Sequence, residues 1–79
     1  MKRFVITQAK SALNIDMILE FWVRHDQITK SYYVVAETKD GTYYSMSGYY
    51  SKKEEAEARM LDIVDEIEGN VKVTKEFYY

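Results

Sequence analysis

Side chains that commonly perform acid–base, nucleophilic or metal chemistry are scarce in this sequence. His25 is its single histidine and it has no cysteine, so neither a histidine-rich metal site nor a catalytic triad with a spare base is expected. Asp16 and Glu20 could form an acid–base pair, but their spacing is also that of ordinary surface carboxylates. The three glycines are isolated, so no phosphate-binding glycine loop is present. We therefore expect a protein that is not an enzyme and has no metal, cofactor or catalytic residue.

Tyrosine is the residue type whose spacing is most unusual. All eight tyrosines occur as adjacent pairs, which begin at Tyr32, Tyr43, Tyr49 and Tyr78. Successive side chains of a β-strand point to opposite faces, so each pair places one ring in the core and one outside it. Tyrosine combines an apolar ring with a polar hydroxyl and is therefore a favoured interface residue. The pairs predict an aromatic surface that a partner covers.

Length and composition predict one small domain over residues 1–79. Of the 79 residues, 47% are hydrophobic and 30% are charged, which is typical of a folded globular protein. No apolar run approaches the roughly 20 residues that a membrane span requires. Met1 is not followed by the apolar core of a signal peptide. We expect a cytoplasmic protein without membrane contact.

A helix is predicted from about Ser51 to Glu68. Ser51 and Glu54 have the spacing of a capping box, and Gly69 can end the helix in the left-handed conformation. Apolar residues at helical spacing form one face: Ala56, Met60, Ile63, Val64 and Ile67.

The residues before this helix predict a hairpin and a third strand. Ser31–Thr38 and Thr42–Tyr49 are rich in strand-forming residues, and Asp40-Gly41 between them is a strong turn signal. Alternation of side-chain types from Met17 to Arg24 predicts a further strand, with a helix over Ser11–His25 as the alternative.

Two more strands are predicted at the ends of the chain. They cover Phe4–Thr7 and Val71–Tyr78, and they could be neighbours in the sheet. The fold class that follows is α+β: an antiparallel sheet of about four or five strands, with one α-helix (about 51–68) packed on one face.

The hairpin register assigns residues to the two faces of this sheet. A two-residue loop at Asp40-Gly41 places Val35 opposite Met46 and Val34 opposite Ser47. The core face would then carry Met17, Leu19, Phe21, Val23, Tyr33, Val35, Tyr44 and Met46. The second face would carry Ile18, Glu20, Trp22, Arg24, Tyr32, Val34, Ala36, Thr38, Tyr43, Ser45, Ser47 and Tyr49.

This second face is the first candidate for binding. One helix can cover only one side of a sheet, and the tyrosine, serine and tryptophan on the other side resemble the composition of an antibody paratope. The alternative is a solvated face, because antiparallel sheets often expose mixed residues to water.

The acidic end of the predicted helix is the second candidate. Asp62, Asp65, Glu66 and Glu68 crowd its last two turns, where negative charge opposes the helix dipole. These carboxylates either lie on a solvated face or contact a cationic partner.

The junction between the last hairpin strand and the helix loosely resembles a known family. Tyr50 to Ala56 reads aromatic-Ser-Lys-Lys-Glu-Glu-Ala after Gly48-Tyr49. Arm-type DNA-binding domains of tyrosine recombinases place Thr-Lys-x-Glu-Ala after a Gly-Phe pair, so Ala56 lies one position late. The resemblance implies DNA binding by a three-stranded sheet and a helix within residues 17–68. However, Arg24 is almost the only base on the second face, whereas DNA binding needs several phosphate contacts.

Three functions are therefore considered. The leading hypothesis is a protein-binding module, by analogy a small stoichiometric regulator or inhibitor of the phage or mobile-element type. The alternatives are a DNA- or RNA-binding domain that stacks aromatic rings on bases, and a structural homodimer whose open faces cover each other. The predicted partner-binding residues are Trp22, Arg24, Tyr32, Tyr43, Ser45, Ser47, Tyr49, Asp62, Asp65 and Glu66.

Overall fold

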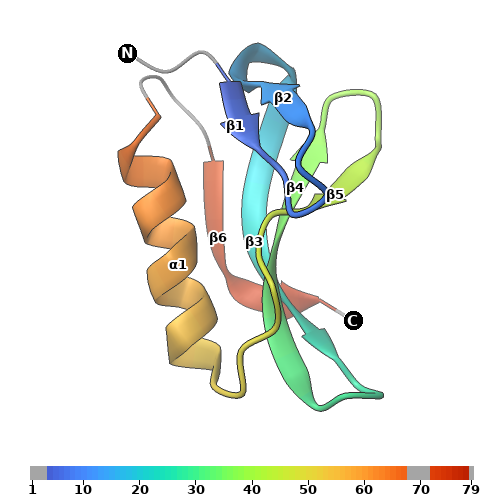
Figure 1. Cartoon of the computed structure of the whole chain (residues 1–79), viewed down its shortest axis with the longest axis vertical. Helices are drawn as coiled ribbons and strands as arrows, with labels where there is room; N and C mark the ends of the chain where they lie inside the picture. Colours follow the sequence, from blue (N-terminus) through green and yellow to red (C-terminus); the bar gives the residue numbers. More distant parts are fainter. Residues whose placement is uncertain (1–3, 68–71, 79) are drawn as a thin grey trace.

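The computed structural model describes residues 4–67 and the backbone of residues 72–78, and within them the chain has an α+β fold (Figure 1). These residues form two sheets and one α-helix. The elements in chain order are β1 (Phe4–Ile6), β2 (Ala12–Asn14), a 3-10 turn (Ile15–Met17), β3 (Ile18–Asp26), β4 (Ser31–Thr38), β5 (Tyr43–Ser45), α1 (Lys53–Asp65) and β6 (Lys72–Tyr78).

The main sheet has four strands in the order β5-β4-β3-β6. The pairs β3–β4 and β4–β5 are antiparallel, as predicted, whereas β6 runs parallel to β3. A parallel neighbour requires a long crossover connection, and α1 lies in the segment that connects β5 to β6. The prediction of an entirely antiparallel sheet was therefore wrong at this edge.

The strands β1 and β2 form a separate two-stranded ribbon. Val5 lies opposite Leu13, and a tight turn joins the strands because Thr7 N–H donates to the Ser11 carbonyl and Lys10 adopts a φ of 69°. Phe4–Ile6 therefore pairs with β2, and not with the C-terminal strand as the sequence suggested. The strand predicted from Met17 to Arg24 is confirmed as β3, and the alternative helix over Ser11–His25 is not formed, because these residues make up β2, the 3-10 turn and most of β3.

The helix α1 packs against β3 and β4. Ala56, Met60 and Ile63 are buried, as its predicted apolar face requires, while Val64 and Ile67 are partly buried against them. No helix in the described part of the chain is long and apolar enough to cross a membrane.

Its N-terminal cap lies one residue later than predicted. Glu55, and not Glu54, reaches back: its Oε1 accepts from Lys52 N–H at 3.2 Å and from the Ser51 hydroxyl at 3.4 Å. Gly69, the predicted C-terminal residue, lies outside the described residues.

The β4–β5 loop differs from the predicted two-residue turn and changes the register. Thr38 N–H donates to the Thr42 carbonyl, Gly41 N–H donates to the Thr38 carbonyl, and Gly41 has a φ of 86°. This is a three-residue loop with a left-handed glycine. Val35 consequently lies opposite Ser45 instead of Met46.

This shift inverts the predicted faces of β4 but keeps those of β5. Val34 and Ala36 are fully buried in the core between sheet and helix, whereas Tyr33 and Val35 lie on the other side. Tyr44 and Met46 face the core as predicted, with Met46 buried and Tyr44 partly buried.

The strand β3 contains an irregularity that reverses its first residues. The pairing with β4 shifts between Ile18 and Glu20, so Ile18 joins the core while Met17 and Leu19 are exposed. The prediction that Met17 and Leu19 face the core was wrong for this reason. Phe21 and Val23, beyond the irregularity, are fully buried as predicted.

Candidate binding face

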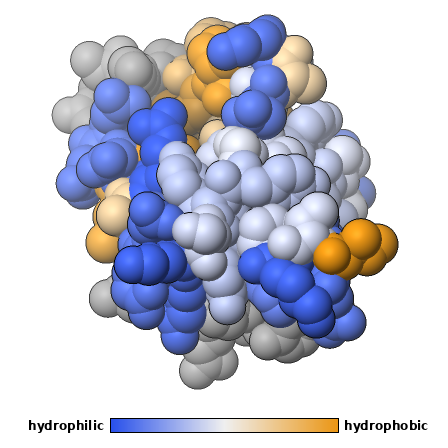
Figure 2. Space-filling view, turned by 60° about the horizontal axis from the view of Figure 1, so that its bottom comes forward, coloured by the Kyte–Doolittle hydropathy of each residue, from blue (hydrophilic) through white to orange (hydrophobic). Residues whose placement is uncertain are grey.

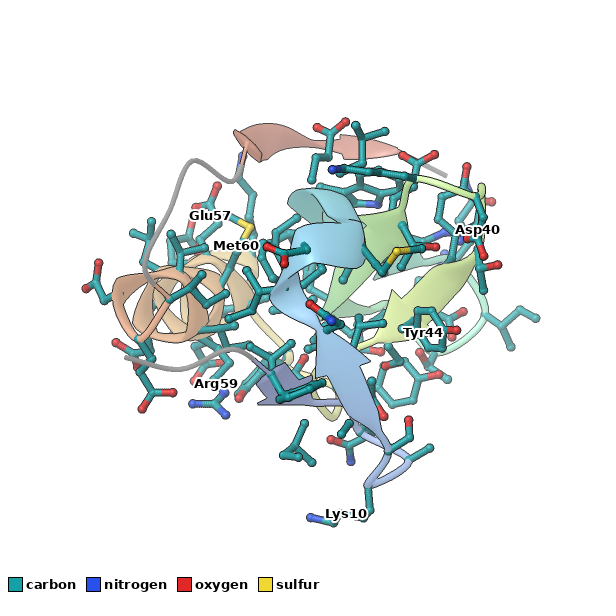
Figure 3. All side chains as sticks on the ribbon, turned by 90° about the horizontal axis from the view of Figure 1, so that it is seen from above. Lys10, Asp40, Tyr44, Glu57, Arg59 and Met60 are labelled. Carbon is teal, nitrogen blue, oxygen red and sulfur yellow. The ribbon has the colours of Figure 1, made fainter. Side chains whose placement is uncertain are left out.

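The side of the main sheet opposite α1 is hereafter called the outer face. Residues directly opposite each other in neighbouring strands share a face, and the register pairs Trp22 with Val35, Arg24 with Tyr33 and Glu37 with Tyr43. Seen along the strands, α1 lies to one side of β3 and β4, with Met60 directed from the helix towards them (Figure 3). The described outer-face residues are Glu20, Trp22, Arg24, Tyr33, Val35, Glu37, Tyr43, Ser45 and, beyond β5, Tyr49.

Two aromatic pairs on the outer face each join an exposed tyrosine to a less exposed ring. Tyr43 contacts Trp22 edge-on at a centroid distance of 5.5 Å, and Tyr49 contacts Tyr33 in the same manner at 5.3 Å. Trp22 is only 8% exposed, whereas Tyr43 is 53% and Tyr49 62% exposed. Edge-to-face packing is a favourable arrangement for such rings. Each exposed tyrosine therefore packs against another aromatic ring of the same face.

A bulge after β5 turns Tyr49 towards the outer face. Met46 N–H donates to the Val34 carbonyl, but the next bond in the ladder comes from a side chain: Ser47 Oγ accepts from Val34 N–H at 2.9 Å. Backbone pairing resumes between Tyr32 and Tyr50, which exchange two hydrogen bonds. The residues between them leave the ladder, so Tyr49 reaches Tyr33.

The end of the outer face near the β3–β4 turn contains a shallow, open depression. It is lined by Arg24, His25, Asp26, Gln27, Ile28 and Tyr33. Asp26 Oδ1 accepts from the backbone N–H of Ile28 at 2.9 Å, which is the main reason that the pKa of Asp26 lies below its ordinary value. Burial has the second largest effect and raises this pKa, while smaller contributions from the Thr29 backbone and from the Thr29 and Tyr49 side chains lower it further. The turn is therefore held by an ionised carboxylate.

Hydropathy is intermediate over much of the surface at the end of the molecule that carries the β3–β4 turn. A broad pale area lies between strongly hydrophilic side chains in Figure 2. Tyrosine, serine, threonine and tryptophan have such intermediate values. A mixed surface of this kind is typical of reversible protein contacts, which are not more apolar than the rest of a protein surface.

Five predicted site residues share the outer face: Trp22, Arg24, Tyr43, Ser45 and Tyr49. Two others do not. Tyr32 lies on the helix side, where it packs against the core and its ring lies 4.7 Å from that of His25. Ser47 is buried, and its hydroxyl is used by the backbone of Val34 and Gly48. Both placements follow from the register shift and the bulge.

The predicted acidic cluster lies away from the outer face. Asp62, Asp65 and Glu66 are exposed at the C-terminal end of α1, which covers the opposite side of the sheet. One flat partner therefore cannot contact both candidate sites. The sequence prediction missed Tyr33, Val35 and Ile28 as residues of the outer face or its turn.

Comparison with known proteins gives no further assignment. No protein-family model, curated protein or solved structure matches the chain. Within residues 4–67 no cluster of three or more histidine, aspartate or glutamate side chains could hold a metal ion. The function is therefore inferred from the geometry of the outer face.

Proposed function

We propose that this protein is a non-enzymatic module that binds a protein partner through its outer face and acts as a stoichiometric regulator or inhibitor. The observation that supports this most is the pair of exposed tyrosines, Tyr43 and Tyr49, held in contact with Trp22 and Tyr33. Rings that are already positioned lose little conformational freedom when a partner covers them.

The two rings are large enough to dominate an interface. An aromatic side chain buries roughly 150–250 Å², so covering a half-exposed ring removes about 100 Å² from water. At about 25 cal/mol per Å², this stabilises a complex by about 2–3 kcal/mol per ring. Contributions of that size are typical of interface hot spots.

Charge and burial favour a protein over a nucleic acid as the partner. Among the described outer-face residues, Glu20 and Glu37 are acidic and Arg24 alone is basic. Phosphate binding depends on several cations, which this part of the face lacks. Trp22 is also too deeply buried to stack on a base.

A second copy of the chain is one partner that this proposal includes. Two outer faces could cover each other about a two-fold axis, as in most homodimers. Sedimentation equilibrium at tens of micromolar should then detect a dimer. A monomer at every concentration would exclude self-association and leave a different protein as the partner.

Site-specific photo-crosslinking tests the proposal. A photoreactive phenylalanine analogue replaces Tyr43 in one variant and Ile6, on the ribbon, in a control; Ile6 is 59% exposed and so similarly accessible. In host cells the Tyr43 variant should form a defined protein adduct that the Ile6 variant does not. Equal labelling at both positions, or an adduct that nuclease removes, would contradict a protein-binding outer face.

A further inference from the structure

Arg24 is the basic residue among the described side chains of the outer face. It is partly buried, directly opposite Tyr33, and lines the depression near the β3–β4 turn. Within the described part of the chain, the guanidinium makes no hydrogen bond or ion pair. A guanidinium carries five N–H donors that match a carboxylate in a two-pronged contact. The electrostatic complement of this position is an anion.

The nearby Asp26 does not supply that anion. Its Oδ1 already accepts from the N–H groups of Ile28 and Thr29, and the side chain of Tyr49 also interacts with it. This carboxylate holds the turn in shape, and no ion pair joins it to Arg24 among the described residues. Among the described residues, Arg24 therefore has no anionic partner and could accept one from another molecule.

Ile28 adds an apolar contact beside Arg24. It lies in the β3–β4 turn, lines the same depression and is 92% exposed. Its backbone N–H is fixed by Asp26, so the side chain is presented by an ordered turn. A β-branched side chain also has few rotamers to lose on binding. The depression thus combines a cation, an aromatic ring and an exposed aliphatic group.

Building on the protein-binding function above, we propose that this depression binds an extended acidic segment of the partner. Arg24 binds an aspartate or glutamate carboxylate, and an adjacent apolar side chain of the segment packs against Ile28 and Tyr33. A nucleic acid fits less well, because Glu20, Glu37 and Asp26 would repel a continuous row of phosphates. A single carboxylate flanked by apolar residues avoids most of that repulsion.

A peptide titration followed by nuclear magnetic resonance tests this inference. The probe is the blocked peptide acetyl-Gly-Ser-Leu-Asp-Leu-Ser-Gly-amide, compared with the same peptide carrying asparagine in place of aspartate. The aspartate peptide should shift the Arg24 Nε–H signal and the Tyr33 and Ile28 amides. Its affinity should exceed that of the asparagine peptide about tenfold or more, since hydrogen bonds to charged groups are the stronger kind.

Substitutions identify the groups responsible. Arg24→Gln should lower the affinity about tenfold or more, and Ile28→Thr, which keeps the branched shape, about fivefold. Lys10→Gln is the matched control, because Lys10 projects from the turn of the ribbon and has the same charge (Figure 3). It should leave the affinity unchanged. If Arg24→Gln does not fold, the Ile28→Thr variant and the comparison of the two peptides still test whether the depression binds an acidic segment.

Three results would overturn the inference: equal affinity of the two peptides, unchanged affinity after Arg24→Gln in a folded protein, or tighter binding of a 12-nucleotide single-stranded DNA or of phosphatidylserine vesicles. The proposed function would survive the first two results if Tyr43 still forms a specific protein adduct. In that case the outer face would bind protein by other chemistry.

Discussion

Replacing Ser47 by alanine should destabilise the fold. The same change at a serine on the exposed surface of a sheet would cost little, but Ser47 is buried. Ser47 Oγ is the acceptor for Val34 N–H at 2.9 Å, and Val34 is fully buried. Ser47→Ala leaves this N–H without an acceptor in the core. Such a group costs about 1–3 kcal/mol. A domain of this size has a stability on the order of 4–12 kcal/mol, so the loss should be readily measured.

Ser45→Ala is the matched control. Ser45 is exposed, and its hydroxyl donates to the Ser47 carbonyl at 3.1 Å, whereas the Ser47 hydroxyl accepts from a backbone N–H of the core. We expect its removal to cost about 0.5 kcal/mol or less. In urea unfolding the two variants should differ by at least about 1 kcal/mol, and a loss of 2 kcal/mol corresponds to a fall in Tm of about 8–16 °C.

Hydrogen exchange of the Val34 amide locates the effect. This amide should be protected in the native protein and in Ser45→Ala, and should exchange much faster in Ser47→Ala. Equal unfolding free energies for the two variants, with unchanged protection of Val34, would refute the bulge and the register on which the outer face depends.

Three further predictions concern the turn, the pH dependence and the helix end. Gly41→Ala should cost about 1 kcal/mol in urea unfolding, because Gly41 has a φ of 86° and no contact would compensate. The Thr38 hydroxyl, followed by the Thr42 backbone N–H, holds the pKa of Asp40 below its ordinary value of 3.8, so ionised Asp40 stabilises the fold above that pH. Asp40→Asn should therefore lower the urea midpoint at neutral pH, and the difference from the unmodified protein should shrink as the pH falls below 3.8. Asp65→Lys at the end of α1 should raise stability by about 0.3–1 kcal/mol in the same assay. A loss of partner binding in that variant would instead assign the acidic helix end to the interface.

The helix was predictable because its signal is redundant. Ala56, Met60 and Ile63 repeat at helical spacing, and their burial confirms the predicted face. The cap was harder to place, because Glu54 and Glu55 are adjacent and a one-residue change in the start exchanges their roles. The geometry of the first turn decides between them.

The faces of β4 were not predictable from alternation alone. Val34, Val35 and Ala36 are consecutive apolar residues, so a shift of one position leaves the pattern equally plausible. The register depends on the loop, and Asp40-Gly41 suits both a two-residue turn and the three-residue loop that forms. Tyr33 was therefore predicted in the core and Tyr32 on the binding face, and the structure reverses them.

Two further features depend on contacts that the sequence does not display. The ribbon turn uses Lys10 at positive φ where a glycine would be the usual signal. The bulge that directs Tyr49 depends on a side chain, Ser47, replacing a backbone acceptor. In contrast, Trp22, Arg24 and Tyr43 were placed correctly because their strands alternate regularly around them.

The affinity of two matched double variants for the partner tests the central claim most directly. Tyr43→Ala with Tyr49→Ala removes the exposed rings of the outer face, whereas Phe4→Ala with Ile6→Ala removes side chains that are 54% and 59% exposed on the ribbon. With the protein crosslinked at Tyr43 as the ligand, titration calorimetry should show that the first pair weakens binding about 100-fold or more. The ribbon pair should leave the affinity unchanged. Equal losses from both pairs, or a loss from the ribbon pair alone, would contradict a binding site on the outer face.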